Sequence, residues 1–253
     1  MNYQKSEAEI QLMRQGGQIL AEVLQAVSQA VRPGISTSQL DMLARQGLKA
    51  RGASPSFLGY RTGNISFPAS LCTSVDEGVV HGVPAPDFIL KDGQIIGLDL
   101  GAWYQGLCTD MAITVPVGKI NTRAAKLIKV TKTALTEGIK KVKDGARVGD
   151  IGEAVQAYVA AAGFSVVRDL VGHGVGRAVH EEPRVPNFGH AGTGPLLREG
   201  MTVAIEPMVN VGKPDIKVLT DGWTVVTADG SLSAHFEHTV LVTKHGSEIL
   251  TKV

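Results

Sequence analysis

Residues 97–111, with the sequence GLDLGAWYQGLCTDM, contain the pattern that decides the fold. Apolar residues with strand preference flank a short polar segment that contains glycine, which is typical of a β-hairpin. With the turn at Tyr104-Gln105, Asp99 would stand directly opposite Asp110 on one face of the hairpin. The Cβ atoms of such a pair lie roughly 4.5–5.5 Å apart, and like charges at that distance are destabilising.

Two environments could accommodate these facing carboxylates. On an edge hairpin, both would point to water. The flanking runs at residues 95–98 and 111–115 instead look like buried strands, which favours a buried pair. Buried facing carboxylates need a proton or a cation between them, and a hard divalent cation is the usual solution.

Composition excludes several classes of function. The 253 residues suit one large domain or two small ones. With 25 basic and 24 acidic residues, the chain has no electrostatic footprint for nucleic acid or an anionic membrane. Cys72 and Cys108 are too few for a disulfide framework, which favours an intracellular protein. No apolar run reaches the length of a membrane span, so we expect a soluble, cytoplasmic protein.

Two helices are expected at the start of the chain. Ser6-Glu7-Ala8-Glu9 is a capping box that opens the first, which ends at Pro33-Gly34. Ser36 with Gln39 opens the second, which stops near Gly52. This second helix carries Leu40, Leu43 and Leu48.

The second half of the chain repeats this pattern. Residues 31–34 recur as residues 142–145, an offset of 111, after a second long helix at about Asn121 to Val142. Residues 90–93 are echoed by residues 197–200, an offset of 107. The matching segments could be chance, because Asp-Gly and Glu-Gly are common turn signals.

Acidic residues repeat together with their strands. Leu98-Asp99 in the first half matches Ile205-Glu206 in the second. Glu237 offers a second acid in the second half, as Asp110 does in the first. We therefore predict a duplicated α/β unit. The two halves, about residues 1–116 and 117–253, would send their acids to one shared centre.

A fifth candidate ligand is His173, which stands between glycines in Gly172-His173-Gly174-Val175-Gly176. Small neighbours let the backbone approach a site closely while the imidazole reaches in. A phosphate loop is the competing interpretation, but the following residues are not the apolar helix that a dinucleotide fingerprint needs. His180-Glu181-Glu182 is not a zincin motif either, because position 184 is Arg.

Charge decides the expected number of metal ions. Asp99, Asp110, Glu206 and Glu237 carry four negative charges, which two divalent ions would neutralise and one would not. Carboxylates with one imidazole favour Mn, Fe, Co or Zn. Two such ions about 3.5–4 Å apart can bridge a water, lower its pKa toward ~7 and polarise a carbonyl, which is hydrolytic chemistry. No Gly-x-Ser-x-Gly nucleophile pattern competes for this role.

Two further histidines, His81 and His180, lie in turn segments next to the proposed centre. A single histidine is more often structural than functional. Because both of these are adjacent to the candidate ligands, we expect functional roles for them.

These residues resemble those of a known family, the type I methionine aminopeptidases. The resemblance implies an α/β (α+β) pita-bread fold, in which duplicated helix–helix–strand units are related by a pseudo-two-fold axis around a curved antiparallel sheet. The resemblance covers essentially the whole chain, as a single catalytic domain of residues 1–253. Its matching segments are Cys72–Val75 with Val80–Pro84, Leu98-Asp99 with Thr109-Asp110, Gly172–Arg177 with His180–Pro183, Ala204–Met208, and Gly222–Thr224 with Phe236–Thr239.

The resemblance implies that the five candidate ligands hold two metal ions, with Asp110 and Glu237 bridging them. Glu206 is also similar to the residue that shuttles the proton of the attacking water. His81 matches the histidine that contacts the scissile amide and assists the tetrahedral intermediate, and His180 matches the one that binds the substrate carbonyl. Members of the family remove the initiator methionine from nascent chains when the next residue is small.

A methionine pocket follows from the same resemblance and makes independent physical sense. A thioether prefers polarizable and aromatic surroundings. The residues expected to supply them are Tyr60, Phe67, Cys72 and Trp223, with Phe57 as a further candidate. Val179 stands where the family often has an aromatic residue, and the loop Arg61–Ser66 is longer than usual. Both departures alter the shape of the pocket and leave the ligands intact.

Two rival functions remain open at this point. A proline-specific relative, an aminopeptidase P or prolidase, usually carries a large N-terminal domain, whereas here the catalytic unit starts almost at Met1. A non-catalytic pita-bread binding protein typically lacks metal ligands, and all five are present here. The expected partners are nascent polypeptide N-termini. Ribosome contact is implied by the substrate alone, and family analogy favours a monomer.

Overall fold

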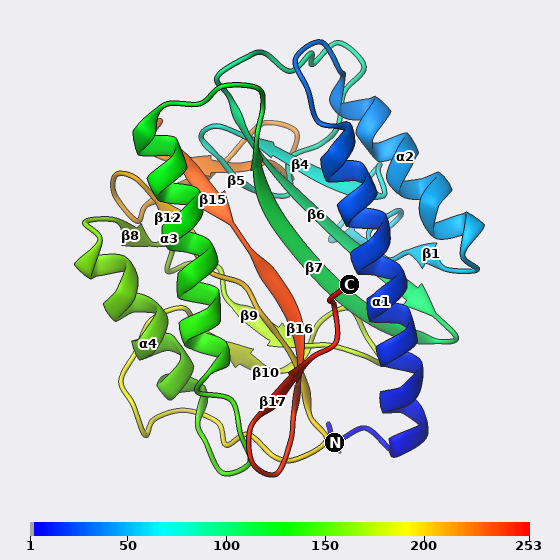
Figure 1. Ribbon diagram of the computed structural model, residues 1–253, viewed down its shortest axis with the longest axis vertical. Helices are drawn as coiled ribbons and strands as arrows, with labels where there is room; N and C mark the ends of the chain where they lie inside the picture. Colours follow the sequence, from blue (N-terminus) through cyan, green and yellow to red (C-terminus); the bar gives the residue numbers. More distant parts are fainter. Residues whose placement is uncertain (1–2) are drawn as a thin grey trace.

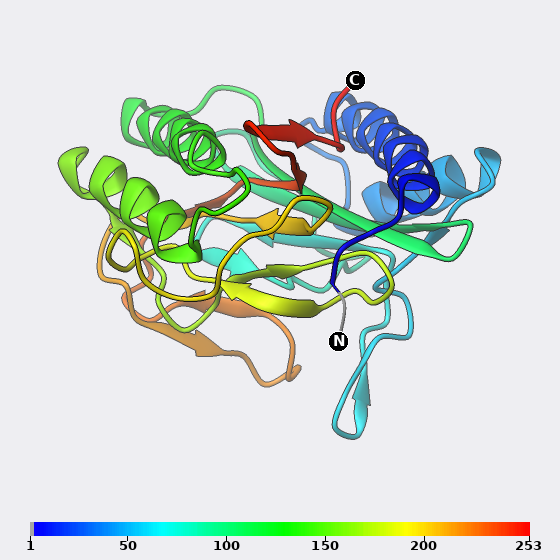
Figure 2. The ribbon, with the colours of Figure 1, turned by 90° about the horizontal axis from the view of Figure 1, so that it is seen from below.

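The structure, a computed structural model, describes residues 3–253 (Figure 1). Within this range, two pairs of helices lie on the same side of a twisted β-sheet (Figure 2). The pairs are α1 (Glu7–Ala30) with α2 (Thr37–Ala50), and α3 (Thr122–Ile139) with α4 (Val148–Ala161). The predicted succession of a long helix and a shorter helix in each half is confirmed.

Local sequence signals set the starts of these helices. The Ser6 N–H donates to Glu9 Oε2 at 2.7 Å and the Glu9 N–H donates to Ser6 Oγ at 3.3 Å, which is the predicted capping box. Ser36 and Gln39 make the same reciprocal pair at α2. Of the three leucines that α2 carries, Leu43 is 40% exposed. The buried row of α2 follows the i, i+4 spacing of Leu40, Ala44 and Leu48, and Leu43 lies outside it.

The main sheet has nine strands, in the order β1-β6-β7-β16-β11-β9-β10, with β4 added to β6 and β17 added to β16. Neighbouring strands pair antiparallel throughout. The strands are β1 (Ser54–Pro55), β4 (Leu71–Val75), β6 (Ile95–Tyr104), β7 (Leu107–Pro116), β9 (Gly172–Gly174), β10 (Glu181–Val185), β11 (Thr202–Ile205), β16 (Glu237–Val242) and β17 (Ser247–Ile249).

Three smaller sheets complete the fold. Figure 2 shows β2–β3 and β13–β14 as hairpins that project on the side away from the helices. The strands are β8 (Ser165–Val166), β12 (Met208–Asn210) and β15 (Ser233–His235) in one sheet, β5 (Gly78–Val80), β13 (Ile216–Val218) and β14 (Val225–Thr227) in another, and β2 (Arg61–Thr62) with β3 (Ile65–Ser66).

The predicted hairpin is formed by β6 and β7, but its register differs from the expected one. The turn lies at Gln105-Gly106, with φ angles of 49° and 83°, and Asp99 pairs with Ala112 instead of Asp110. Positive φ at both central residues indicates a type I′ turn, whose twist matches the twist of the strands. The partner of Asp99 moves by two residues, which keeps side chains on the same face. Asp99 and Asp110 are therefore diagonal neighbours on one face.

The two halves repeat the same backbone hydrogen bonds. In the first half, the Gly34 N–H donates to the carbonyl of Leu90 at 2.8 Å. In the second half, the Gly145 N–H donates to the carbonyl of Leu197 at 3.1 Å. These four positions are related by the offsets of 111 and 107 residues that the sequence predicts.

Strand register extends the correspondence to β7 and β16. Leu98 pairs with Ile113 across β6 and β7, and its counterpart Ile205 pairs with His238 across β11 and β16. Ile113 therefore corresponds to His238, an offset of 125 residues.

This register corrects one expectation about the acids. Under the 125-residue offset, the counterpart of Asp110 is His235, and the counterpart of Glu237 is Ala112. The sequence pattern paired Glu237 with Asp110 as the second acid of each half. Residues two apart share a face of a strand, so the sequence pattern identifies the face but not the position along it.

Hydrophobic clusters lie between each helix pair and the sheet. In the first half, Leu98 and Leu100 pack with leucines of α1 and α2, so strand alternation directs Asp99 to the opposite face of the sheet. In the second half, Ile205 packs with residues of α3 and α4 in the same way. In residues 3–253, none of the helices has the length and apolar character needed to span a membrane.

Candidate metal centre and adjoining pocket

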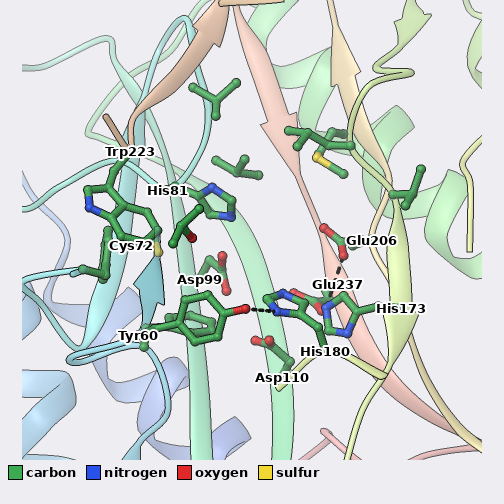
Figure 3. A pocket seen from close by; sticks show the side chains of 18 of the residues that line it. Tyr60, Cys72, His81, Asp99, Asp110, His173, His180, Glu206, Trp223 and Glu237 are labelled. Atoms are coloured by element: carbon green, nitrogen blue, oxygen red, sulfur yellow. Dashed lines mark hydrogen bonds and ion pairs between the residues drawn. The ribbon is translucent and has the colours of Figure 1, made fainter. Parts of the chain in front are cut away.

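A cavity of about 390 Å³ opens on the face of the sheet that Asp99 reaches (Figure 3). All five candidate metal ligands line it. They come from adjacent strands: Asp99 lies in β6, Asp110 in β7, Glu237 begins β16, Glu206 follows β11, and His173 lies in β9. The central strands thus bring together side chains that are up to 138 residues apart in the sequence.

Three of these five side chains lie close enough together to hold one metal ion. Asp110, His173 and Glu237 each offer one atom such that all three atoms lie within 4.8 Å of one another. Glu206 Oε1 lies 3.6 Å from His173 Nε2, an interaction drawn in Figure 3. Asp99 hydrogen-bonds Asp110 and faces the charge of Glu206.

Electrostatics make this carboxylate cluster unfavourable without a cation. Burial, followed by the charge of Glu206, raises the pKa of Asp110 to about 8. Burial also raises the pKa of Glu206 to about 8. The pKa values of Asp99 and Glu237 rise well above the usual range, through burial first and the neighbouring carboxylates second. Asp99 Oδ1 and Glu237 Oε1 are buried without a hydrogen-bond partner in the structure.

His173 is arranged as a neutral ligand. Its Nδ1 lies 2.8 Å from the carbonyl oxygen of Gly174, which can only accept, so Nδ1 carries the proton and donates it. Burial, and then the neighbouring His180, lower the pKa of His173 to about 3. Nε2 therefore presents a lone pair toward Glu206 and the cavity, which is the arrangement that metal-binding histidines use.

Taken together, these residues fit a divalent metal site. Unpartnered carboxylate oxygens and one imidazole lone pair converge in a buried pocket, where a cation would compensate the negative charge. Mixed oxygen and nitrogen donors suit first-row ions such as Mn, Fe, Co or Zn.

The two further histidines flank this centre (Figure 3). His81 has a φ angle of 58°, and burial, followed by the nearby His235 and His180, lowers its pKa to about 4. The ring of His180 contacts the ring of His173 edge-on, with centroids 4.4 Å apart. Its Nδ1 lies 2.8 Å from the hydroxyl of Tyr60.

An ion pair links the N-terminal segment to the loop that carries His180. Lys5 Nζ lies 2.8 Å from Glu181 Oε2, and the Lys5 side chain is 0% exposed. Glu181 Oε1 also accepts hydrogen bonds from the N–H groups of Arg177 and Ala178, at 2.5 and 3.0 Å. This buried ion pair fixes the backbone directly after His180.

The predicted methionine-pocket residues lie on one side of the cavity. Phe67 and Trp223 meet edge-on, with centroids 5.3 Å apart. Cys72 is buried beside Phe67, and Phe57 and Tyr60 pack against the same cluster. Apolar lining residues that the sequence patterns did not single out are Val80, Leu170, Val171, Met208, Val218 and Val225.

The sequence patterns also missed one polar residue beside the candidate metal centre. His235 ends β15, is 3% exposed, and its Nε2 lies 3.6 Å from Glu206 Oε2. Burial lowers its pKa to about 3. The spacing of two residues from Glu237 was the available signal, since alternate residues of an extended chain share a face.

Comparison with known proteins adds an independent finding. A model of metallopeptidase family M24 matches residues 11–244. The methionine aminopeptidase of Clostridium perfringens is 51% identical over 249 residues, covering 98% of this chain and 98% of that one. Methionine aminopeptidase 1 of Bacillus subtilis is 46% identical over 249 residues, with the same coverage.

Solved structures agree with the sequence relatives. The methionine aminopeptidase from Rickettsia prowazekii superposes with a TM-score of 0.95 at 41% identity, covering 99% of this chain and 100% of that chain. The prolidase from Pyrococcus horikoshii has a TM-score of 0.77 at 24% identity and is covered over only 64% of its length. That second likeness is one of fold alone. The predicted pita-bread fold is confirmed.

Proposed function

This chain belongs to metallopeptidase family M24, in which it is one of the methionine aminopeptidases, and from this premise we propose how its pocket works. The substrate is a polypeptide with an N-terminal methionine followed by a small residue, and the first peptide bond is hydrolysed. The observation that carries the proposal is the convergence of five ligand side chains beside an aromatic pocket.

The proposed cofactor is a pair of divalent ions, Mn, Fe, Co or Zn. Four buried carboxylates carry a charge that one ion would leave half uncompensated. Asp99, Asp110, His173, Glu206 and Glu237 would hold the pair. When bound, the ions supply a water of lowered pKa and polarise the substrate carbonyl.

The remaining steps belong to the side chains around that centre. Glu206 takes a proton from the attacking water and delivers it to the leaving amine, in addition to its role as a ligand. His81 hydrogen-bonds the scissile amide and stabilises the tetrahedral intermediate, and His180 donates to the substrate carbonyl. The Tyr60 hydroxyl beside His180 Nδ1 supports this role, because a donor at Nδ1 leaves the ring proton on Nε2.

The methionine side chain of the substrate occupies the apolar end of the cavity. Tyr60, Phe67, Cys72 and Trp223 surround it, and a thioether makes favourable contacts with aromatic ring edges. Val179, which was expected to form part of this wall, is buried in a neighbouring cluster with Leu107 and Cys108 and is not among the residues that line the cavity.

We further propose that the molecule acts as a single catalytic domain and a monomer in the cytoplasm. Its two halves, residues 1–116 and 117–253, meet where β7 pairs with β16. The partners are nascent polypeptide N-termini, with transient ribosome contact implied by that substrate. No proposed role involves nucleic acid or a membrane.

The alternative functions are not favoured. Proline-specific enzymes share only the fold with this chain. A non-catalytic binding protein has no need of five converging ligands with unpartnered carboxylate oxygens.

Peptide turnover tests the proposal. Protein stripped with a chelator and reconstituted with Mn²⁺ or Co²⁺ should release methionine from Met-Gly-Met, and the stripped protein should not. An X-Pro peptide is the control substrate and should remain intact. Cleavage of the X-Pro peptide without release of methionine from Met-Gly-Met would support the proline-specific alternative.

A further inference from the structure

His235 is a buried imidazole beside the metal centre that the proposed mechanism does not use. Its Nε2 lies 3.6 Å from Glu206 Oε2 and 4.0 Å from Glu237 Oε2. Within the described residues, this nitrogen is buried and makes no hydrogen bond. A buried polar atom without a partner is costly, so its position calls for an explanation.

The internal repeat places His235 at the position that a ligand holds in the other half. The Thr239 Oγ1 accepts from the Asp110 N–H at 2.8 Å and donates to the Asp110 carbonyl at 2.9 Å. The Thr114 Oγ1 makes the same two bonds with the N–H and carbonyl of His235, at 2.9 and 2.8 Å. Equivalent threonines therefore hold Asp110 and His235 in equivalent backbone positions, and both side chains point to the shared centre.

Glu206 lies between two imidazoles, one facing each of its oxygens. Oε1 faces His173 Nε2 and Oε2 faces His235 Nε2, both at 3.6 Å. The proton of His173 is on Nδ1, so its Nε2 offers a lone pair, and Oε1 and this nitrogen are a pair of metal ligands. A second lone pair facing Oε2 would repel the carboxylate, whereas an N–H at that place would attract it.

We propose that His235 is a positioning residue that donates its Nε2–H to Oε2 of Glu206 and so reserves Oε1 for the metal beside His173. The distance of 3.6 Å shortens to a hydrogen bond when metal binding fixes the carboxylate. This inference rests on the proposed function, because it requires Glu206 to be a ligand. Outer hydrogen bonds of this kind orient metal ligands and set their affinity.

Calorimetric titration of the chelator-stripped protein with Mn²⁺ tests the inference without measuring catalysis. His235→Leu, which has no donor, should weaken Mn²⁺ binding by roughly 10–100-fold. His235→Gln, which keeps an N–H at similar reach, should stay within about threefold of the unaltered protein. His238→Gln is the matched control, because its ring bonds Thr251 and lies away from the cavity, and it should bind Mn²⁺ normally. If His235→Leu fails to fold, His235→Met replaces it.

A double-variant cycle separates action through Glu206 from direct ligation. Glu206→Ala alone should weaken Mn²⁺ binding, and adding His235→Leu to it should cause no further loss. Equal losses in both backgrounds would overturn the inference, because His235 would then act independently of Glu206. A His235→Gln protein as weak as His235→Leu would also overturn it. Normal Mn²⁺ binding by Glu206→Ala would instead refute the ligand assignment of the proposed function.

Discussion

The two central strands, β7 and β16, hold equivalent backbone positions in the two halves but present different side chains to the same cavity. At one pair of equivalent positions stand Asp110 and His235, and at another stand Ala112 and Glu237. Asp99 and Glu206 are the pair in which both halves contribute an acid. The halves share a framework of backbone hydrogen bonds, and they divide the chemistry between them.

The two halves differ more at the edges of the main sheet than at its centre. β6 continues into β7 through the turn Gln105-Gly106, whereas β12 to β15 intervene between β11 and β16. The outer partner of β6 is β4, which carries Cys72 of the apolar pocket, and the outer partner of β11 is β9, which carries His173. The comparison shows that backbone symmetry builds the scaffold, and that differences between side chains build a site with an apolar end and a metal end.

Removal of one shared ligand from each half should give the largest effect. Asp110→Ala and Glu237→Ala should each lower kcat/KM for Met-Gly-Met by about 10³-fold or more, because each carboxylate is assigned to both ions and several kcal/mol of transition-state stabilisation depend on them. Steady-state kinetics at saturating Mn²⁺ measure this loss. Full activity in either variant would show that the halves do not share the metal centre.

The next largest effect concerns the ion pair between Lys5 in the first half and Glu181 in the second. Lys5→Met should destabilise the protein by about 3–5 kcal/mol, because it leaves the buried carboxylate of Glu181 without its cation. Urea denaturation measures the change. Arg14→Met is the control, since it breaks a partly exposed pair between Arg14 in α1 and Glu248 in β17, and it should cost at most about 1 kcal/mol. Equal costs for the two variants would contradict the role of the buried pair.

The buried carboxylates that the two halves contribute predict that the stability of the metal-free protein depends on pH. Folding raises the pKa of Asp110 from 3.8 and that of Glu206 from 4.5, both to about 8. Their contribution to stability is therefore fully present below about pH 4 and is lost as the pH rises through about 8. The Tm of chelator-treated protein should fall from about pH 5 to about pH 8.5, as the free energy of unfolding decreases by an amount on the order of a few kcal/mol.

Added Mn²⁺ should restore the Tm at the higher pH, and Glu206→Gln should flatten the slope of the metal-free protein. A metal-free protein that gained stability with rising pH would contradict the burial of these carboxylates.

The smallest effect tests the equivalence of the two frameworks. Gly34 and Gly145 have φ angles of +88° and +79°, and a Cβ at either would meet no atom within 4 Å. Gly34→Ala and Gly145→Ala should therefore each cost about 1–2 kcal/mol, from backbone conformation alone. Chemical denaturation of both variants gives the comparison. A difference between them larger than about 1 kcal/mol would show that the two turns are not equivalent.

Local signals explain what could be predicted from the sequence. The capping residues Ser6 and Ser36 act within four residues of themselves, and the segments that end at Gly34 and Gly145 share a valine, a basic residue and the final glycine. Faces of strands were also predictable, because alternation alone places Asp99 and Asp110 on one side.

Other features depend on contacts that leave no local pattern. The hairpin register required a positive φ at Gln105, which is uncommon outside glycine. The position of His235 depends on pairing between strands far apart in the sequence, as does the contact between Lys5 and Glu181. In the pocket wall, Leu170 lies in the loop between β8 and β9, and Met208 begins the short strand β12, so hydrophobic periodicity is too brief there to identify either residue.

Anomalous diffraction from crystals soaked in Mn²⁺ tests the central claim most directly. Two peaks are expected inside the cavity, each bound by side chains from the set Asp99, Asp110, His173, Glu206 and Glu237, with both halves contributing to each ion. Absence of any peak among these side chains, or a single ion bound by one half alone, would contradict it.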